Sequence, residues 1–139
     1  SLLQKAGFVD MVLQKTPFNG IIFGVLDLRD FKSVPVASYN LLANNRETQV
    51  IFYEFQAGSR MLATEIYGLL KQKAGLSIGQ TVNETNQFGD NSFYVNFLEQ
   101  TEASQANTFL VVKANDYVYA LTYLREYHPL IKQLITLLT

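Results

Sequence analysis

The fold is decided by residues 48–75, which read TQVIFYEFQAGSRMLATEIYGLLKQKAG. Residues 48–55 alternate between two faces, as the side chains of a β-strand do. Val50, Phe52 and Glu54 point to one face, and Ile51, Tyr53 and Phe55 point to the other. Because apolar residues occupy both faces, this strand is predicted to be partly buried on both sides of a sheet.

A helix is predicted to follow this strand directly. Ala57-Gly58-Ser59 breaks the strand, and Ser59 is of a residue type that caps helices. Gly75 is expected to follow the end of the helix, because glycine readily adopts the left-handed conformation found there. The stripe expected to face the core consists of Leu62, Ile66, Leu69 and Leu70, with Met61 beside it.

The residues before this unit predict one helix and two further strands. Leu2, Ala6, Val9 and Leu13 recur at helical spacing, so a short helix is expected from residue 2 to about residue 15, ended by Pro17. Residues 21–26, IIFGVL, are apolar on both alternating faces, which predicts a central strand. Residues 34–42 predict a weaker strand, in which Pro35 suits an edge or a first position, and residues 44–46 predict a turn.

The C-terminal half predicts a meander of strands and a last helix. Residues 77–84 form a weak strand and residues 92–98 a clear one, with a turn at 86–91 between them. After a polar loop at 100–105, strands 108–113 and 117–124 form a hairpin around residues 114–116. Pro129 suits the first turn of the helix. The apolar stripe of this helix consists of Leu130, Ile131, Leu134, Ile135 and Leu138.

Together these elements predict a single α+β domain over residues 1–139. Its core would be a largely antiparallel sheet of about six or seven strands packed with three helices. This element order is similar to that of the Mog1/PsbP-like sandwiches and to that of the roadblock/longin group of profilin-like scaffolds. The resemblance rests on element order without a sequence motif, and it implies a layered α+β fold without a particular activity.

The composition excludes several classes of function. The formal net charge is −1 and the Lys and Arg residues are scattered, so nucleic-acid binding is disfavoured. No stretch reaches the roughly 18 consecutive apolar residues of a membrane span. The chain has no cysteine, which excludes disulfides and thiolate zinc sites. This absence, the charged fraction of 17% and the many Asn, Gln and Tyr residues lean towards an extracytoplasmic (periplasmic or secreted) bacterial domain.

His128 is the only histidine of the chain and has two competing interpretations. It stands near Arg125 and Glu126, where it could serve as a general base. Alternatively, it caps the last helix, one residue before Pro129. We favour the cap, because a catalytic histidine needs a nucleophile or a second ligand and the sequence identifies neither.

No metal or cofactor site is predicted. A metal shell lacks a second histidine or a thiolate, and residues 84–91 have the residue types of a calcium loop without its pattern. Gly58 and Arg60 stand at a helix N-terminus that could hold an anion. Ala57-Gly58-Ser59 is also an ordinary helix start, and that interpretation is favoured.

Tyrosines gather near the C-terminus and form the candidate binding surface. On the last predicted strand, Tyr117, Tyr119 and Tyr123 point to one face, and Arg125, Tyr127 and His128 continue the stretch. Tyrosine supplies a large contact area with a polar tip, so this face could bind a partner or form the wall of a groove. The alternative is that these rings lie under the N-terminal helix, with their hydroxyls at its rim.

We therefore expect a non-catalytic binding or protein-interaction module that acts through the tyrosine face. Replacing Tyr119 and Tyr123 is expected to abolish partner binding without unfolding the protein. One alternative is a small-molecule carrier or sensor with an aromatic-lined pocket, and another is a hydrolase or isomerase that uses His128 with a nearby carboxylate. Self-association through the apolar last helix, which would give a homodimer, is a further alternative.

Overall fold

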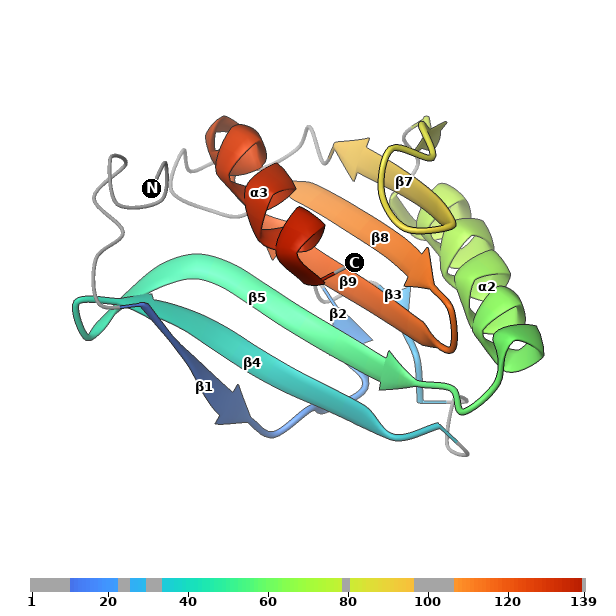
Figure 1. The fold of residues 1–139 in the computed structure, drawn as a ribbon, viewed down its shortest axis with the longest axis horizontal. Helices are drawn as coiled ribbons and strands as arrows, with labels where there is room; N and C mark the ends of the chain where they lie inside the picture. Colours follow the sequence, from blue (N-terminus) through green and yellow to red (C-terminus); the bar gives the residue numbers. More distant parts are fainter. Residues whose placement is uncertain (1–10, 23–25, 30–33, 79–80, 97–106, 139) are drawn as a thin grey trace.

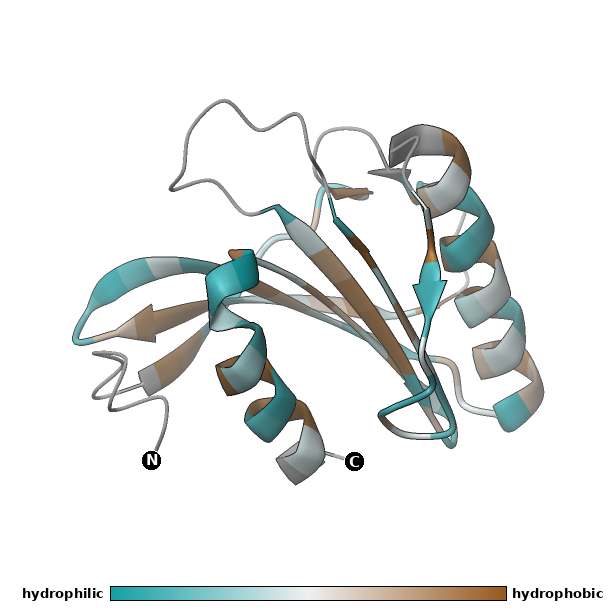
Figure 2. Ribbon diagram, turned by 90° about the horizontal axis from the view of Figure 1, so that it is seen from above, coloured by the Kyte–Doolittle hydropathy of each residue, from teal (hydrophilic) through white to brown (hydrophobic). Residues whose placement is uncertain are grey.

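A computed structural model describes residues 11–22, 26–29, 34–78, 81–96 and 107–138 (Figure 1). Seven strands form one antiparallel sheet in the order β1-β4-β5-β9-β8-β7-β6. The strands are β1 (Met11–Thr16), β4 (Val36–Ala43), β5 (Arg46–Gln56), β9 (Tyr117–Tyr123), β8 (Thr108–Ala114), β7 (Asn91–Asn96) and β6 (Asn83–Glu84). Helix α2 (Arg60–Ile78) and helix α3 (His128–Leu138) lie on opposite faces of this sheet (Figure 2). The α+β class and the antiparallel sheet are therefore confirmed.

Strand β5 has the two-sided alternation that its sequence predicts. Tyr53 and Phe55 are buried among residues of α2, whereas Val50 and Phe52 are buried in the cluster that includes Ile131 of α3. Because β5 and β9 are flanked by strands on both sides, their backbone hydrogen bonds are satisfied within the sheet. The sheet thus separates two hydrophobic cores, each closed by one helix.

Helix α2 begins where the sequence predicts, but a different set of its side chains faces the core. The helix also ends later than predicted, at Ile78. The Oγ atom of Ser59 accepts a hydrogen bond from the Leu62 N–H at 3.1 Å, so the predicted cap is confirmed. Met61 and Leu69 are 79% and 41% exposed, so they do not belong to the stripe that faces the core. That stripe consists of Ala63, Ile66, Tyr67, Leu70 and Ala74. Leu62 packs against this core as predicted, and Tyr67 packs edge-on against Phe93 of β7, with ring centroids 5.4 Å apart.

Gly75 does not follow the end of α2, because the helix continues to Ile78. A Cβ atom at Gly75 would lie 3.6 Å from Val82, at ordinary contact distance, so the glycine packs closely against the next segment. The beginning of the weak strand predicted at 77–84 is therefore helical, and only Asn83 and Glu84 remain as β6. Glu84 is fixed to α2 because its carboxylate accepts a hydrogen bond from the Tyr67 hydroxyl at 2.6 Å.

The predicted N-terminal helix is wrong over residues 11–15, which belong to β1. This strand pairs along its whole length with β4, from Met11 opposite Ala43 to Thr16 opposite Ser38. Val12 and Leu13 are 55% and 46% exposed, so the apolar spacing that suggested a helix does not mark a buried face. The described residues contain the two helices α2 and α3 rather than the predicted three, and residues 2–10 lie outside them.

Residues 21–26 do not form a central strand of the sheet. They contribute to a separate pair of two-residue strands, β2 (Ile21–Ile22) and β3 (Leu26–Asp27), whose intervening residues lie outside the described ones. Ile22 is fully buried in the core under α2, together with Leu28. Of the described residues in this run, Ile22 is thus buried by packing onto the sheet rather than by insertion into it.

The remaining predictions agree with the described structure except at their ends. Strands β7, β8 and β9 form the expected meander, and Asn44 and Asn45 form the expected turn with φ angles of 55° and 63°. Pro35 directly precedes β4, which lies next to the edge strand β1. Residues 97–98 of the predicted strand and the loop at 100–105 lie outside the described residues.

The apolar residues of helix α3 pack against the sheet of the same chain. Leu130, Ile131 and Ile135 are buried, and Leu134 packs against the same core. These four residues of the predicted stripe therefore cover the protein's own sheet, and the side chain of Leu138 lies outside the described part of the structure.

Candidate functional site

The six predicted site residues fall into two groups at opposite ends of β9. Tyr117 and Tyr119 stand at the beginning of the strand and Tyr123 at its end, roughly 20 Å from Tyr117. The chain then forms a short 3-10 helix, η1 (Arg125–Tyr127), and enters α3 at His128. The tyrosines of β9 share the face that carries α3, as the alternation predicted, but they do not form one site.

The first group belongs to a row of four aromatic rings, which we call the aromatic surface: Tyr39 of β4, Phe52 of β5, and Tyr117 and Tyr119 of β9. Ring centroids are 6.4 Å apart for Tyr39 and Phe52, 5.5 Å for Phe52 and Tyr119, and 5.8 Å for Tyr117 and Tyr119. The two β9 rings are nearly parallel, at 8°. Phe52 is buried, whereas the three tyrosines are half-buried. The row is thus continuous across three adjacent strands and open to solvent.

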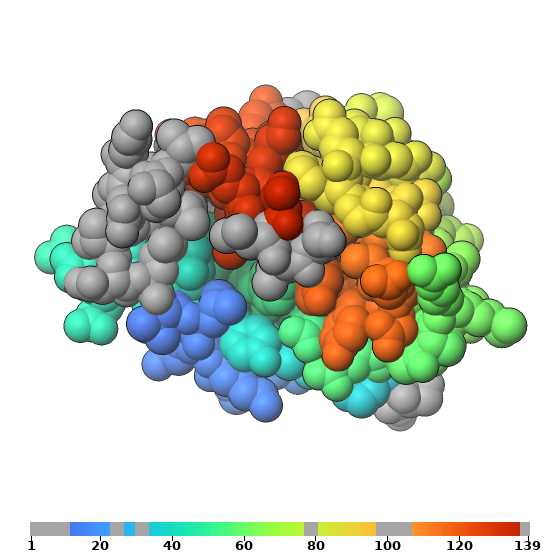
Figure 3. Space-filling view, in the orientation of Figure 1, coloured from blue at the N-terminus to red at the C-terminus, as the bar shows by residue number. Residues whose placement is uncertain are grey.

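The aromatic surface is open because α3 covers only part of its face of the sheet. Ile131 and Ile135 of α3 pack against Leu121 and Tyr123, towards the end of β9. The beginning of β9 and the end of β5 extend beyond the helix (Figure 1). In the space-filling view, atoms of β4, β5 and β9 adjoin one another below α3 (Figure 3).

One carboxylate stands within this surface. Glu54 of β5 lies directly opposite Tyr119 of β9, and Gln56 lies opposite Tyr117. The Gln56 amide donates a hydrogen bond to Glu54 Oε1 at 2.9 Å. Burial raises the pKa of the Tyr119 hydroxyl, and the charges of Glu54 and Asp116 raise it further. The aromatic surface therefore includes one carboxylate, Glu54, directly beside Tyr119.

Sequence reasoning found Tyr117 and Tyr119 but missed Tyr39, Phe52 and Glu54 as members of the same site. Phe52 and Glu54 were correctly placed on one face of their strand. Their proximity to β9 depends on the register Glu54–Tyr119, which joins residues 65 positions apart. Alternation within a single strand carries no information about that register.

The second group is a pair formed by the buried Tyr123 and the half-buried His128. The Tyr123 hydroxyl lies 2.6 Å from His128 Nδ1, and the two rings stack with centroids 5.9 Å apart. Tyr94 of β7 lies against the same histidine ring at 5.9 Å. Tyr123 is fully buried, so it leaves the candidate binding surface and anchors the start of α3.

This geometry matches neither sequence interpretation of His128. Its side chain bonds to the neighbouring strand rather than to its own helix, so it does not act as the expected cap. Among the residues that the structure describes, no carboxylate is bonded to it, although Glu126 is a near neighbour in sequence. Burial lowers the pKa of His128, and the charge of Lys132 lowers it further. The ring therefore serves as a packing element between Tyr94 and Tyr123.

Arg125 and Tyr127 also lie away from the aromatic surface. The Arg125 backbone N–H donates to Asn107 Oδ1 at 2.8 Å, and its side chain is exposed. Tyr127 packs against Ala43 and Leu130. Both residues therefore belong to the junction between β9 and α3.

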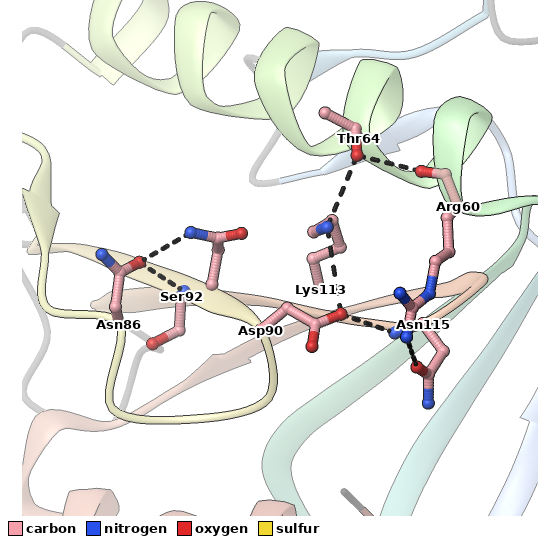
Figure 4. Close-up of polar contacts among 8 residues, drawn as sticks. Arg60, Thr64, Asn86, Asp90, Ser92, Lys113 and Asn115 are labelled. Atoms are coloured by element: carbon pink, nitrogen blue, oxygen red, sulfur yellow. Dashed lines mark hydrogen bonds and ion pairs between the residues drawn. The ribbon is translucent and has the colours of Figure 1, made fainter.

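A polar cluster joins the N-terminus of α2 to two loops (Figure 4). Arg60 donates to Asn115 Oδ1 at 2.8 Å, and Asp90 accepts the Asn115 N–H at 2.9 Å. Lys113 lies 3.4 Å from Thr64 Oγ1 and 3.9 Å from Asp90 Oδ2. Arg60 is thus engaged with the β8–β9 turn, and Ser59 caps the helix, which is the ordinary helix start that the sequence favoured.

A groove of about 700 Å3 lies on the other side of the sheet. It is lined by Phe18, Asn19, Gly20, Leu28, Arg29, Val34 and Val36. Phe18 packs edge-on against Tyr53, with ring centroids 5.5 Å apart. Arg29 is paired with Asp27 at 2.6 Å, so its charge is largely compensated.

Within the described ranges, no group of three or more His, Asp or Glu side chains is placed to hold a metal ion. No helix in that part of the chain is long and apolar enough to cross a membrane. Comparisons with protein-family models, with curated proteins and with solved structures found no match.

Acidification is expected to destabilise the protein through His128. Its folded-state pKa is lowered, so the unfolded chain binds a proton more readily than the folded one. The contribution of the neutral ring is complete above about pH 6.5 and is lost as the pH falls through the lowered folded-state pKa. A His128→Asn variant should show a weaker dependence of its unfolding free energy on pH between 7.5 and 5.5, measured by urea denaturation.

The single histidine also allows a direct check, because its ring protons give isolated signals in proton NMR. A titration midpoint at or above 6.5 in the folded protein would contradict the lowered pKa of His128.

Replacing Gly89 by alanine is expected to loosen the polar cluster. Gly89 has a φ of 55°, and a Cβ atom there would lie 2.5 Å from the backbone oxygen of Lys113. We expect a loss of at least about 2 kcal/mol of unfolding free energy, from the left-handed conformation and the clash together. Gly58→Ala is the control, because Gly58 has a φ of 82° with nothing within 4 Å. It should lose only about 1 kcal/mol. Equal losses in urea denaturation would remove the clash from the explanation.

Proposed function

We propose that this protein is a non-catalytic binding module that recognises a protein partner on the aromatic surface. The observation that carries the proposal is the row Tyr39–Phe52–Tyr119–Tyr117, which crosses three strands and leaves three tyrosines half-exposed. Tyrosine is enriched at the energetic centres of protein interfaces, where it combines apolar area with a hydroxyl that can hydrogen bond.

The arrangement of the rings favours recognition at low entropic cost. Each ring contacts its neighbour, and all four stand on strands of one sheet rather than on loops. Rings that are already ordered lose little rotamer freedom when a partner binds. An aromatic surface built in this way can bind a partner without catalysing a reaction.

From the composition, we further propose that the protein is bacterial and works outside the cytoplasm. We also propose that its fold is similar to the Mog1/PsbP-like sandwiches or to the roadblock/longin group, with which it shares the predicted element order. A binding module needs no particular fold class, so the proposal does not depend on either likeness.

Loss of the exposed tyrosines is expected to abolish binding while the fold persists. Peptides would be selected from a phage-displayed random library against the wild-type protein and then measured by fluorescence anisotropy. The double variant Tyr117→Ser/Tyr119→Ser should bind the selected peptides at least about tenfold more weakly, because hot-spot truncations typically cost more than 1 kcal/mol each.

The matched control is Met61→Ser/Leu76→Ser, which removes two side chains that are 79% and 78% exposed on α2. It should leave peptide affinity unchanged. Cooperative thermal unfolding of both double variants would exclude unfolding as the cause. Peptides that bind the tyrosine variant as well as the wild type would refute the proposal.

A second candidate function is the binding of a small molecule in the groove beside Phe18. Its volume of about 700 Å3 lies in the range of small-molecule sites, and its lining combines apolar side chains with the polar Asn19 and Arg29. This candidate is independent of the aromatic surface, since the groove lies on the face that carries α2.

A thermal-shift panel of metals, nucleotides, lipids, sugars and short peptides tests the groove. A ligand of the folded state raises the melting temperature. Val36→Trp should fill part of the groove and abolish such a shift, whereas Met61→Trp on α2 should not. A shift that survives Val36→Trp would place the ligand elsewhere.

A further inference from the structure

The β9 side of the aromatic surface combines stacked ring faces with a single carboxylate. Tyr119 and Glu54 are direct cross-strand neighbours, so their Cβ atoms lie roughly 5 Å apart. On the same face, their neighbours along the flanking strands are Ala37 of β4 and Val112 of β8, which carry no charge. Among the described strand residues, Lys15 of β1 is a cation on this face; it lies opposite Tyr39, two strands from Glu54.

The carboxylate has hydrogen-bonding capacity left. Gln56 donates to Oε1 of Glu54 at 2.9 Å. In the described part of the chain, no recorded donor reaches Oε2, and Glu54 is only half-buried. A carboxylate in this position accepts charge-assisted hydrogen bonds from an incoming cation.

The ring faces select the same kind of ligand. An aromatic face is electron-rich and attracts a cation placed over it, and Tyr117 and Tyr119 form a stacked pair of nearly parallel rings with centroids 5.8 Å apart. A guanidinium group is planar, stacks on tyrosine and forms paired hydrogen bonds with a carboxylate, whereas an ammonium group offers a strongly hydrated point charge. Of the cationic side chains, arginine uses both features of the site.

We infer that the aromatic surface receives an arginine side chain of the protein partner, stacked on the Tyr117–Tyr119 pair and hydrogen-bonded to Glu54. This inference rests on the proposed function and specifies its partner. The negative charge of Glu54 and Asp116 disfavours nucleic acids and acidic peptides at the same place. It also gives the interaction a dependence on salt, since the cation and the carboxylate attract each other through partly exposed surface.

The experiment uses the peptides selected against the full protein. Their sequences should be enriched in arginine. In the best binder, replacing the arginine by citrulline, which keeps the shape but removes the charge, should weaken binding about tenfold, and replacing it by lysine should weaken it about threefold. Fluorescence anisotropy at low and high salt gives the affinities.

On the protein, Glu54→Gln should weaken the arginine peptide about tenfold but leave the citrulline peptide nearly unchanged, because the two changes remove the same interaction. Glu47→Gln is the matched control, since Glu47 is an exposed carboxylate near the other end of β5. It should change neither affinity. This coupling between Glu54 and the guanidinium is a result that a general loss of stability would not produce.

The outcomes separate the inference from the proposed function. Peptides that depend on Tyr117 and Tyr119 but bind equally well with citrulline would overturn the arginine inference and leave the binding surface intact. The arginine inference and the proposed function would both be refuted if the selected peptides bound independently of Tyr117 and Tyr119, or if the selection gave no peptide. Equal losses from Glu54→Gln and Glu47→Gln would also overturn the role given to Glu54.

Discussion

Burial of β5 and β9 on both faces is the constraint on which the other elements depend. These strands lie inside the sheet, so their side chains must be covered above and below. Val118 and Ala120 face α2, and Leu121 and Tyr123 face α3. Neither helix can be removed without exposing one side of the same two strands, so the domain is stable only as three layers.

The aromatic surface follows from a mismatch of lengths within this arrangement. Helix α3 has 11 residues and is about 16 Å long, whereas β5 has 11 residues and spans about 36 Å. A helix of that length cannot cover the whole of a strand that is twice as long. The uncovered end carries tyrosines rather than leucines, which suits a surface that remains in water because the hydroxyl keeps one end of each ring hydrated.

The sequence predicts the elements best where one pattern has one interpretation. Residues 48–55 alternate strictly and Ser59 precedes a clear helix, so β5 and the start of α2 are predicted correctly. The apolar spacing around Leu13 fits a helix and a strand alike, and pairing with β4 decides for the strand. Tyr117 and Tyr119 could be found from their alternation. Their partners in the site could not, because register and the path of α3 are properties of the assembled sheet.

The two edge strands of the described sheet differ in length, and this difference bears on aggregation of the protein. One edge strand is β6, which is only two residues long. The other edge strand is β1, which has six residues and exposes Val12 and Leu13. An edge strand with exposed apolar side chains is a template on which a second chain can add a strand and begin a fibril. Lys15 within β1 and Pro17 just after it are the residue types that interrupt such growth. Of the two edge strands of the described sheet, β1 therefore offers the longer template for such pairing, with Lys15 and Pro17 opposing it.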